Sequence, residues 1–174
     1  MLLSRRTLFI LFAVFALEPV PFGAWLALIP HVKDSLGLDK SQLALALLGT
    51  PIAVMPSLAL ASRLVLRFGP RRLLTAVLLA QMLCVFLPLI AINQLTLFLA
   101  LACLGFCVAI LQVGLNVYAG RFEKETGRVV MNRCHGFWAL GLTLGSFIVV
   151  TLTQASPNSK YSCRQRRECA GNER

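Results

Sequence analysis

The residues best suited to chemistry in this sequence are a few polar side chains inside long apolar stretches. Glu18 lies near the middle of the first stretch, where a carboxylate costs roughly 2.5–3.5 kcal/mol on membrane-insertion scales. Apolar surroundings favour the neutral acid, so Glu18 can take up and release a proton as its hydration changes. It can also form a hydrogen bond with a sugar hydroxyl. The alternative interpretation is a protonated acid that is hydrogen-bonded within a helix bundle.

Prolines and aromatic residues follow Glu18 within two helical turns. Pro19 and Pro21 lack an amide hydrogen, so each removes a helical hydrogen bond beside the carboxylate. Phe22 and Trp25 follow Glu18 at i+4 and i+7 and are therefore expected on the same helix face. An aromatic platform beside a carboxylate suits a sugar and equally an amphiphilic cation. Trp25 also suits an anchor at the membrane interface.

Three side-chain amides lie inside later apolar stretches. Gln112 and Asn116 share a helix face at i and i+4, and Gln81 lies near the centre of the third stretch. Amides supply both donors and acceptors, as recognition of a polyol requires. They also join helices within a membrane, typically for less than about 2 kcal/mol each. Both interpretations stay open for Gln112 and Asn116, whereas Gln81 is interpreted as a bond between helices.

Patterns typical of catalysis or metal binding do not occur in the sequence. It has no nucleophile with a paired base, no phosphate-binding glycine loop and no metal-ligand spacing. The only histidines are His31 and His135, and His135 is interpreted as an interfacial residue rather than a proton relay. We therefore expect no enzyme activity, no cofactor and no metal site.

Composition identifies the elements that must position these side chains. Of 174 residues, 57% are hydrophobic and 14% are charged, and the mean hydropathy is +0.76. A soluble domain carries about 25% charged residues, so a water-soluble enzyme is excluded. The apolar stretches are continuous rather than alternating, which excludes a transmembrane β-barrel. The sequence predicts an all-α, polytopic membrane helix bundle.

Five apolar segments are long enough to cross roughly 30 Å of hydrocarbon with about 20 residues each. They are residues 7–30, 41–62, 72–92, 97–119 and 136–153. We expect a transmembrane domain over residues 1–153. The first segment also resembles a signal peptide, but its apolar stretch runs on to Pro30 and four more segments follow.

Charge alternates between the connecting segments, and the net charge is +10. The N-terminus, second loop and fourth loop carry ten basic residues: Arg5, Arg6, Arg63, Arg67, Arg71, Arg72, Arg121, Lys124, Arg128 and Arg133. The first loop has Lys33 and Lys40, offset by two aspartates, and the third has no charge. The positive-inside rule predicts a cytoplasmic N-terminus in the inner membrane. The expected environment is a lipid bilayer, with no nucleic-acid partner.

The basic tail, residues 154–174, departs from this charge pattern. It follows the fifth span and is expected outside, yet it carries five basic residues: Lys160, Arg164, Arg166, Arg167 and Arg174. It has too few apolar residues to order itself, so we expect disorder. A re-entrant end would return the tail to the cytoplasm. We favour a tail that is not the original continuation of the protein.

The second loop, residues 62–72, resembles the signature loop of the major facilitator superfamily. In that loop a small residue, an acid, a base, a glycine and a basic pair recur. Four residues match the pattern: Arg67, Gly69, Arg71 and Arg72. Ser62 replaces the usual glycine, and Leu66 stands where the family usually has aspartate. The resemblance therefore does not extend to the acid of the conformational charge network that the family forms at this loop.

Three other stretches look like the sugar-permease-like branch of that superfamily: residues 22–25, 47–51 and 132–141. The resemblance implies two six-helix halves with substrate bound between them near the midplane. Because only five spans are present, it also implies a truncated N-terminal portion. Such a secondary transporter would carry a small polar solute, a sugar, coupled to protons. Four residues are expected at its site: Glu18, Trp25, Gln112 and Asn116.

The fifth span contains a GxxxG pattern at Gly141 and Gly145, which permits close approach of another helix. In antiporters of the superfamily that the chain resembles, the equivalent span tends to carry a glycine- and proline-rich motif. This span has no proline, so the resemblance favours symport over drug–proton antiport. Expected partners are a missing second half or another copy of the chain. Two alternatives stay open: a non-transporting membrane-embedded assembly or binding subunit, and an inert gene remnant.

Overall fold

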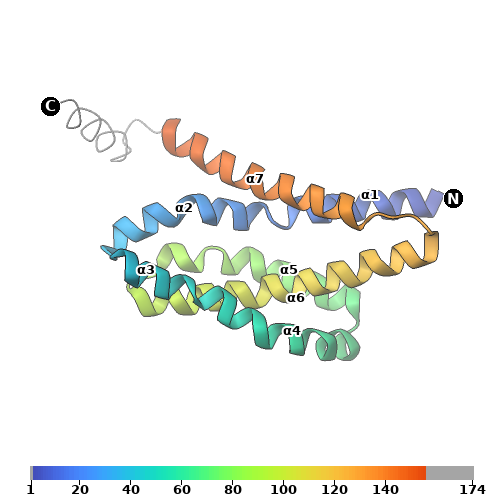
Figure 1. Ribbon diagram of the computed structural model, residues 1–174, viewed down its shortest axis with the longest axis horizontal. Coiled ribbons are helices and arrows are strands. Elements are labelled where there is room, and N and C mark those ends of the chain that lie inside the picture. The colour runs from blue at the N-terminus through green and yellow to red at the C-terminus, as the bar shows by residue number, and fades with distance from the viewer. Residues whose placement is uncertain (1, 156–174) are drawn as a thin grey trace.

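The computed structural model describes residues 2–155, which form seven α-helices and one 3₁₀ helix, η1 (Figure 1). In chain order these are α1 (Leu2–Leu17), α2 (Val20–Leu36), α3 (Lys40–Leu47), α4 (Gly49–Phe68), α5 (Pro70–Cys84), η1 (Leu87–Ile90), α6 (Gln94–Thr126) and α7 (Met131–Ala155). The described residues contain no strand, which confirms the all-α prediction. Most of the predicted tail, residues 156–174, lies outside the described residues.

The helices make five segments that are long and apolar enough to cross a membrane. They are Arg5–Leu36, Lys40–Ala61, Arg72–Ile90, Gln94–Thr126 and Met131–Ala155. Each of these five segments overlaps one of the predicted spans. The first span consists of α1 and α2, and the second consists of α3 and α4, so both are interrupted.

The fourth span, α6, runs beyond both of its predicted ends. At its start, Asn93 Oδ1 accepts a hydrogen bond from the Thr96 amide at 2.8 Å, and Thr96 Oγ1 accepts one from the Asn93 amide at 3.0 Å. This reciprocal cap satisfies two amides at the helix start. At its end, Gly127 adopts a φ of +67°, a left-handed conformation that commonly terminates helices.

The third span differs from the continuous helix expected over residues 72–92. Helix α5 ends at Cys84, and the chain continues in the short 3₁₀ helix η1. Pro88 lies within η1, where its ring removes the amide that an α-helix would use. The C-terminal end of this span is therefore wound more tightly than the sequence pattern predicted.

Helix α6 is the centre of the bundle. It packs against α3, α4 and α5, whereas α7 packs against α1 and α2 (Figure 1). A shared apolar cluster joins α6 and α7 to α1; its buried residues are Leu11, Phe15, Leu115, Ala119, Phe122, Val130 and Cys134. The two members of this cluster on α1, Leu11 and Phe15, lie in the two helical turns that precede Glu18.

The GxxxG pattern brings α7 into backbone contact with the first span. A Cβ added at Gly141 would meet the carbonyl oxygen of Ala16, and one added at Gly145 would meet that of Val20. Ser146 Oγ donates a hydrogen bond to the Gly23 carbonyl at 2.8 Å. The close approach predicted from the two glycines is therefore present.

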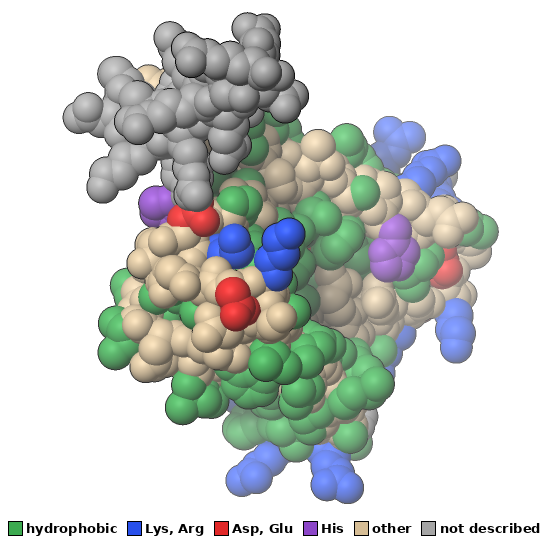
Figure 2. Space-filling model, turned by 60° about the vertical axis from the view of Figure 1, so that its left-hand side comes forward, with side chains coloured by type: hydrophobic (Ala, Val, Ile, Leu, Met, Phe, Trp, Pro, Cys, Tyr) green, Lys and Arg blue, Asp and Glu red, His purple; other side chains and the backbone are tan. Residues whose placement is uncertain are grey.

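The molecular surface is apolar along the helices and charged at their ends. Phe9 is 74% exposed and Met55 is 73% exposed, and Figure 2 shows hydrophobic side chains over much of one face. At the end that comes forward in Figure 2, basic and acidic side chains lie together. This is the pattern expected of helices whose sides contact lipid.

Candidate functional site

The first span breaks at Glu18, a carboxylate near its middle. Helix α1 ends at Leu17 and α2 begins at Val20, with Glu18 and Pro19 in the turn between them. Pro19 has no amide hydrogen to continue the α1 ladder. Non-helical backbone at membrane depth is tolerated where protein or a watery cavity covers it. The break thus places Glu18 where protein groups bind both its backbone and its side chain.

The Glu18 carboxylate is buried, with 2% of the residue exposed. Its Oε1 accepts a hydrogen bond from Gln81 Nε2 at 3.0 Å, and its Oε2 accepts one from Trp138 Nε1 at 3.2 Å. Gln81 Nε2 also donates to the backbone carbonyl of Glu18 at 3.1 Å. Three spans meet at this carboxylate: the first through its break, the third through α5 and the fifth through α7.

Both groups that bind the carboxylate are neutral donors. Gln81 is fully buried, and its Nε2 serves the Glu18 side chain and the Glu18 backbone together. The other atom of the same amide, Oε1, is buried and accepts no hydrogen bond. A buried acceptor without a donor is rare in proteins, so the Gln81 amide is half satisfied.

From the sequence, Gln81 was predicted only to form a hydrogen bond between helices, and Trp138 was not predicted to contact Glu18. The structure shows that Gln81 does bond to another helix, and that its target is the candidate proton site. A signal for Trp138 was present in the sequence. Trp138 precedes Gly141 by three residues, so it lies on the helix face that the glycines press against the first span.

Trp25 lies in a core cluster between α2, α3 and α6. It is 2% exposed and packs with Val32, Ala46, Leu97 and Leu101. Glu18 lies in the turn that precedes α2, and Trp25 lies within α2. The ring is buried rather than exposed at an interface, and its part in solute binding stays a prediction.

Gln112 and Asn116 lie half-buried on α6. Between them, Leu115 packs in the apolar cluster with Phe15 of α1, so this turn of α6 faces the part of the first span that precedes Glu18. Asn116 Oδ1 is buried and has no hydrogen-bond partner. The pair does not bond to Glu18, and its role in binding solute stays a prediction.

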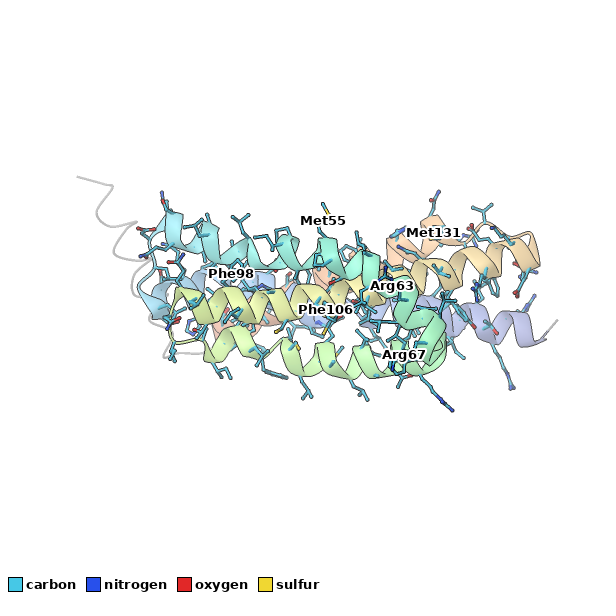
Figure 3. All side chains as sticks on the ribbon, turned by 90° about the horizontal axis from the view of Figure 1, so that it is seen from below. Met55, Arg63, Arg67, Phe98, Phe106 and Met131 are labelled. Atoms are coloured by element: carbon cyan, nitrogen blue, oxygen red, sulfur yellow. The ribbon has the colours of Figure 1, made fainter. Side chains whose placement is uncertain are left out.

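The second loop is a one-residue connection between α4 and α5. Gly69 has a φ of +76°, its amide donates to Val65 O at 3.0 Å, and its carbonyl accepts from the Leu73 amide at 3.1 Å. The Arg67 guanidinium lies 5.5 Å from the centre of the Phe68 ring, within reach of a cation–π contact. Figure 3 shows Arg63 and Arg67 towards the end of the bundle at which Met131 begins α7.

The remaining residues of the loop pattern lie on either side of Gly69. Leu66, at the position of the missing acid, is 87% exposed. Arg71 and Arg72 belong to the first turn of α5, and the Arg71 side chain lies outside the described part of the structure. The loop therefore presents Leu66, Arg67 and Arg72 at the surface.

Comparison with known proteins decides the family. The family model of the Major Facilitator Superfamily matches residues 6–157. This chain belongs to the major facilitator superfamily. It is similar to an uncharacterized MFS-type transporter of Yersinia pestis, with 31% identity over 134 residues, 76% of this chain and 34% of the relative. It is also similar to an uncharacterized transporter of Sinorhizobium fredii, with 30% identity over 140 residues, 77% of this chain and 36% of the relative.

Membership of the superfamily confirms the resemblance seen in the second loop. The chain spans about a third of the length of these curated relatives. No solved structure matched the chain. As a superfamily member with five apolar helical spans, the chain is a multi-pass membrane protein. Superfamily members are in general not enzymes. The sugar-permease-like branch and the truncation stay predictions.

Proposed function

We propose that this chain forms the N-terminal portion of a secondary active transporter that carries a small polar solute, a sugar, together with protons. Membership of the superfamily supports transport, and the geometry of Glu18 supports the coupling to protons. The observation that carries the proposal is a buried carboxylate at a helix break, where it bonds to two other spans. An ionisable group in such a place is expensive and is by default a functional candidate.

Neutral donors around Glu18 support a proton site rather than a permanent ion pair. A carboxylate beside a guanidinium or ammonium group stays charged through the transport cycle. The Glu18 oxygens instead accept from an amide and an indole. Such a carboxyl group can gain or lose its proton when the cavity between two halves opens to water on either side.

The unpartnered oxygen of Asn116 supports a solute rich in hydroxyl groups. Asn116 Oδ1 is buried without a donor, and leaving an acceptor in that condition costs about 1–3 kcal/mol. A sugar hydroxyl would supply the missing donor. Gln112, one turn earlier on the same face, offers a second amide to the same solute.

The distribution of charge supports a cytoplasmic N-terminus in the inner membrane. Nine basic side chains are exposed on the N-terminal segment and around the second and fourth loops: Arg5, Arg6, Arg63, Arg67, Arg72, Arg121, Lys124, Arg128 and Arg133. At the opposite end, Lys33 and Lys40 lie with Asp34 and Asp39. Basic loops remain in the cytoplasm during insertion. We therefore propose that the end of the bundle with the nine basic side chains faces the cytoplasm.

The proposal is tested by reconstitution in proteoliposomes. The chain is prepared alone, and also fused to the second half of the Yersinia pestis relative. Uptake of a panel of radiolabelled monosaccharides is then measured with and without an inward proton gradient. We expect the fusion, and not the chain alone, to accumulate one or more of these sugars when the gradient is applied.

Variants of the fusion separate coupling from transport. Glu18→Gln is expected to abolish accumulation driven by protons while sugar exchange between the two sides continues. Glu125→Gln removes an exposed carboxylate near the end of α6 and is the matched control. Accumulation by Glu18→Gln at the parent rate would overturn the coupling role. A fusion that inserts and moves none of the sugars would overturn the choice of solute.

The chain alone tests the proposed partners. If its exposed apolar faces require a second half, co-expressed second half should co-purify with it and raise its thermal stability. If another copy covers them, the chain should instead purify as a stable homo-oligomer, and the assembly-subunit alternative would replace transport.

A further inference from the structure

We propose that Gln81 is a positioning residue whose side-chain amide turns over when Glu18 gains a proton, and so passes the proton state of Glu18 to α5. This inference rests on the proposed role of Glu18 as the proton site. The observation behind it is the half-satisfied amide: Nε2 makes two hydrogen bonds to Glu18, while Oε1 is buried and makes none.

The observed arrangement fits a charged carboxylate. An ionised carboxylate only accepts hydrogen bonds, and an amide nitrogen carries two hydrogens to give. Gln81 Nε2 uses both, one towards Glu18 Oε1 at 3.0 Å and one towards Glu18 O at 3.1 Å. Trp138 Nε1 supplies the third donor, at 3.2 Å from Oε2. Every donor around Glu18 is thus engaged, and the one idle atom is an acceptor.

A protonated Glu18 reverses this requirement. The added proton on Glu18 Oε1 needs an acceptor, and Gln81 Nε2 beside it is a donor only. Rotation of the amide by half a turn places Gln81 Oε1 where Nε2 was, so that it accepts the carboxyl proton. The idle acceptor is then satisfied, and Trp138 keeps its bond to Oε2. The cost is both hydrogen bonds that Nε2 makes, to Glu18 Oε1 and to the Glu18 carbonyl. The first is replaced by the bond from the carboxyl proton to Gln81 Oε1, whereas the Glu18 carbonyl is released.

The released bond lies at the break in the first span. The Glu18 carbonyl belongs to the turn between α1 and α2, which packing and hydrogen bonds from other helices hold. Helix α5 runs without interruption from Pro70 to Cys84. Gln81 and the one-residue connection at Gly69 therefore belong to the same rigid element. A change in how Gln81 holds the break is transmitted along α5 to the second loop.

Other titratable groups near this region are separable from Glu18. The helices packed around it contribute Cys84 on α5, Cys107 and Glu123 on α6, and Cys134 and His135 on α7. Cys134 and His135 pack on Phe15, one turn before Glu18. His135 is the one histidine among these five groups. His135→Phe therefore serves as a control for any change observed there.

Nuclear magnetic resonance of the full chain in detergent micelles tests the inference directly. The chain is labelled with ¹⁵N and titrated between about pH 4 and pH 9, the range that brackets carboxyl and histidine titration. The indole cross-peak of Trp138 reports the proton state of Glu18, because its N–H bonds to the carboxylate. The side-chain amide cross-peaks of Gln81, identified by their loss in Gln81→Asn or Gln81→Leu, report the turn of the amide. Gln42 and Gln112 supply reference amides.

We expect the Gln81 and Trp138 cross-peaks to shift with one shared midpoint, in the parent and in His135→Phe. In Glu18→Gln both should stay fixed over the whole range. If Trp138 shifts and Gln81 does not, the amide does not respond and the inference is overturned, while the proton site survives. If neither residue shifts, Glu18 does not exchange its proton in this range, and both the inference and the coupling proposal are overturned.

Discussion

The indole Nε1 of Trp138 lies 3.2 Å from Oε2 of Glu18, although 120 positions separate the two residues in the chain. This bond joins α7 to the break in the first span. The same break receives the Gln81 amide from α5. Two spans that do not adjoin the first span in sequence thus meet at its carboxylate.

The bond from Trp138 is expected to contribute measurably to stability. Trp138→Phe keeps an aromatic ring but removes the donor to Glu18 Oε2. Hydrogen bonds to charged groups contribute about 1.5–3 kcal/mol, so the free energy of unfolding should fall by roughly that amount. Unfolding by dodecyl sulfate in mixed micelles measures it. Phe147→Leu, at a ring that is 64% exposed, is the control and should change little. An equal change in the free energy of unfolding in the two variants would show that the Trp138 bond does not contribute to stability.

The contact between α7 and the first span is expected to reject even one added methyl group. In Gly141→Ala the new Cβ meets the carbonyl oxygen of Ala16 and lies 2.9 Å from Pro19 Cγ. Overpacking of this kind typically costs about 1–3 kcal/mol, and thermal unfolding should show it. Gly136→Ala, on the same helix with open space around its Cβ, should be neutral or slightly stabilising. If Gly141→Ala were as stable as Gly136→Ala, the two helices would not lie this close.

The connection between α4 and α5 is expected to need glycine. Gly69 has a φ of +76°, and a side chain held in such a region costs about 1–3 kcal/mol. Gly69→Ala should lower the unfolding temperature. Gly120→Ala within α6, where the φ is helical and nothing lies near the new Cβ, should not. A Gly69→Ala protein with parent stability would mean that the loop adopts another conformation.

The exposed position of the missing acid predicts an effect on rate without an effect on folding. Leu66 is 87% exposed, and substitutions at such positions usually change stability by less than about 0.5 kcal/mol. Leu66→Asp should therefore unfold like the parent. In the fusion that carries a second half, we expect it to raise the transport rate by restoring the acid beside Arg67. Leu66→Asn controls for polarity alone. Equal rates in the three proteins would show that the departure at Leu66 has no consequence.

The spans were predictable because each is a continuous apolar run that must satisfy its backbone as helix in lipid. The break at Pro19 and the close approach at Gly141 were predictable for local reasons, a missing amide hydrogen and a missing Cβ. The winding of η1 around Pro88 was not expected, since hydropathy does not distinguish a 3₁₀ turn from an α-helix.

The partners of Glu18 were not predictable in the same way. Gln81 lies 63 residues from Glu18, and the pair is set by how α5 docks on the first span. Periodicity within one helix does not contain that information. The face that Glu18 and Trp25 are expected to share stays a prediction, because Glu18 lies in the turn before α2 and Trp25 lies within α2.

The most direct test of the central claim is the proton movement that accompanies the solute. Proteoliposomes with the fused protein are loaded with a pH-sensitive dye, and a transported sugar is added outside without any imposed gradient. We predict acidification of the lumen by the parent and by Glu125→Gln, and none by Glu18→Gln, although labelled sugar still enters. Equal acidification by Glu18→Gln and the parent would contradict the role of Glu18 as the coupling carboxylate.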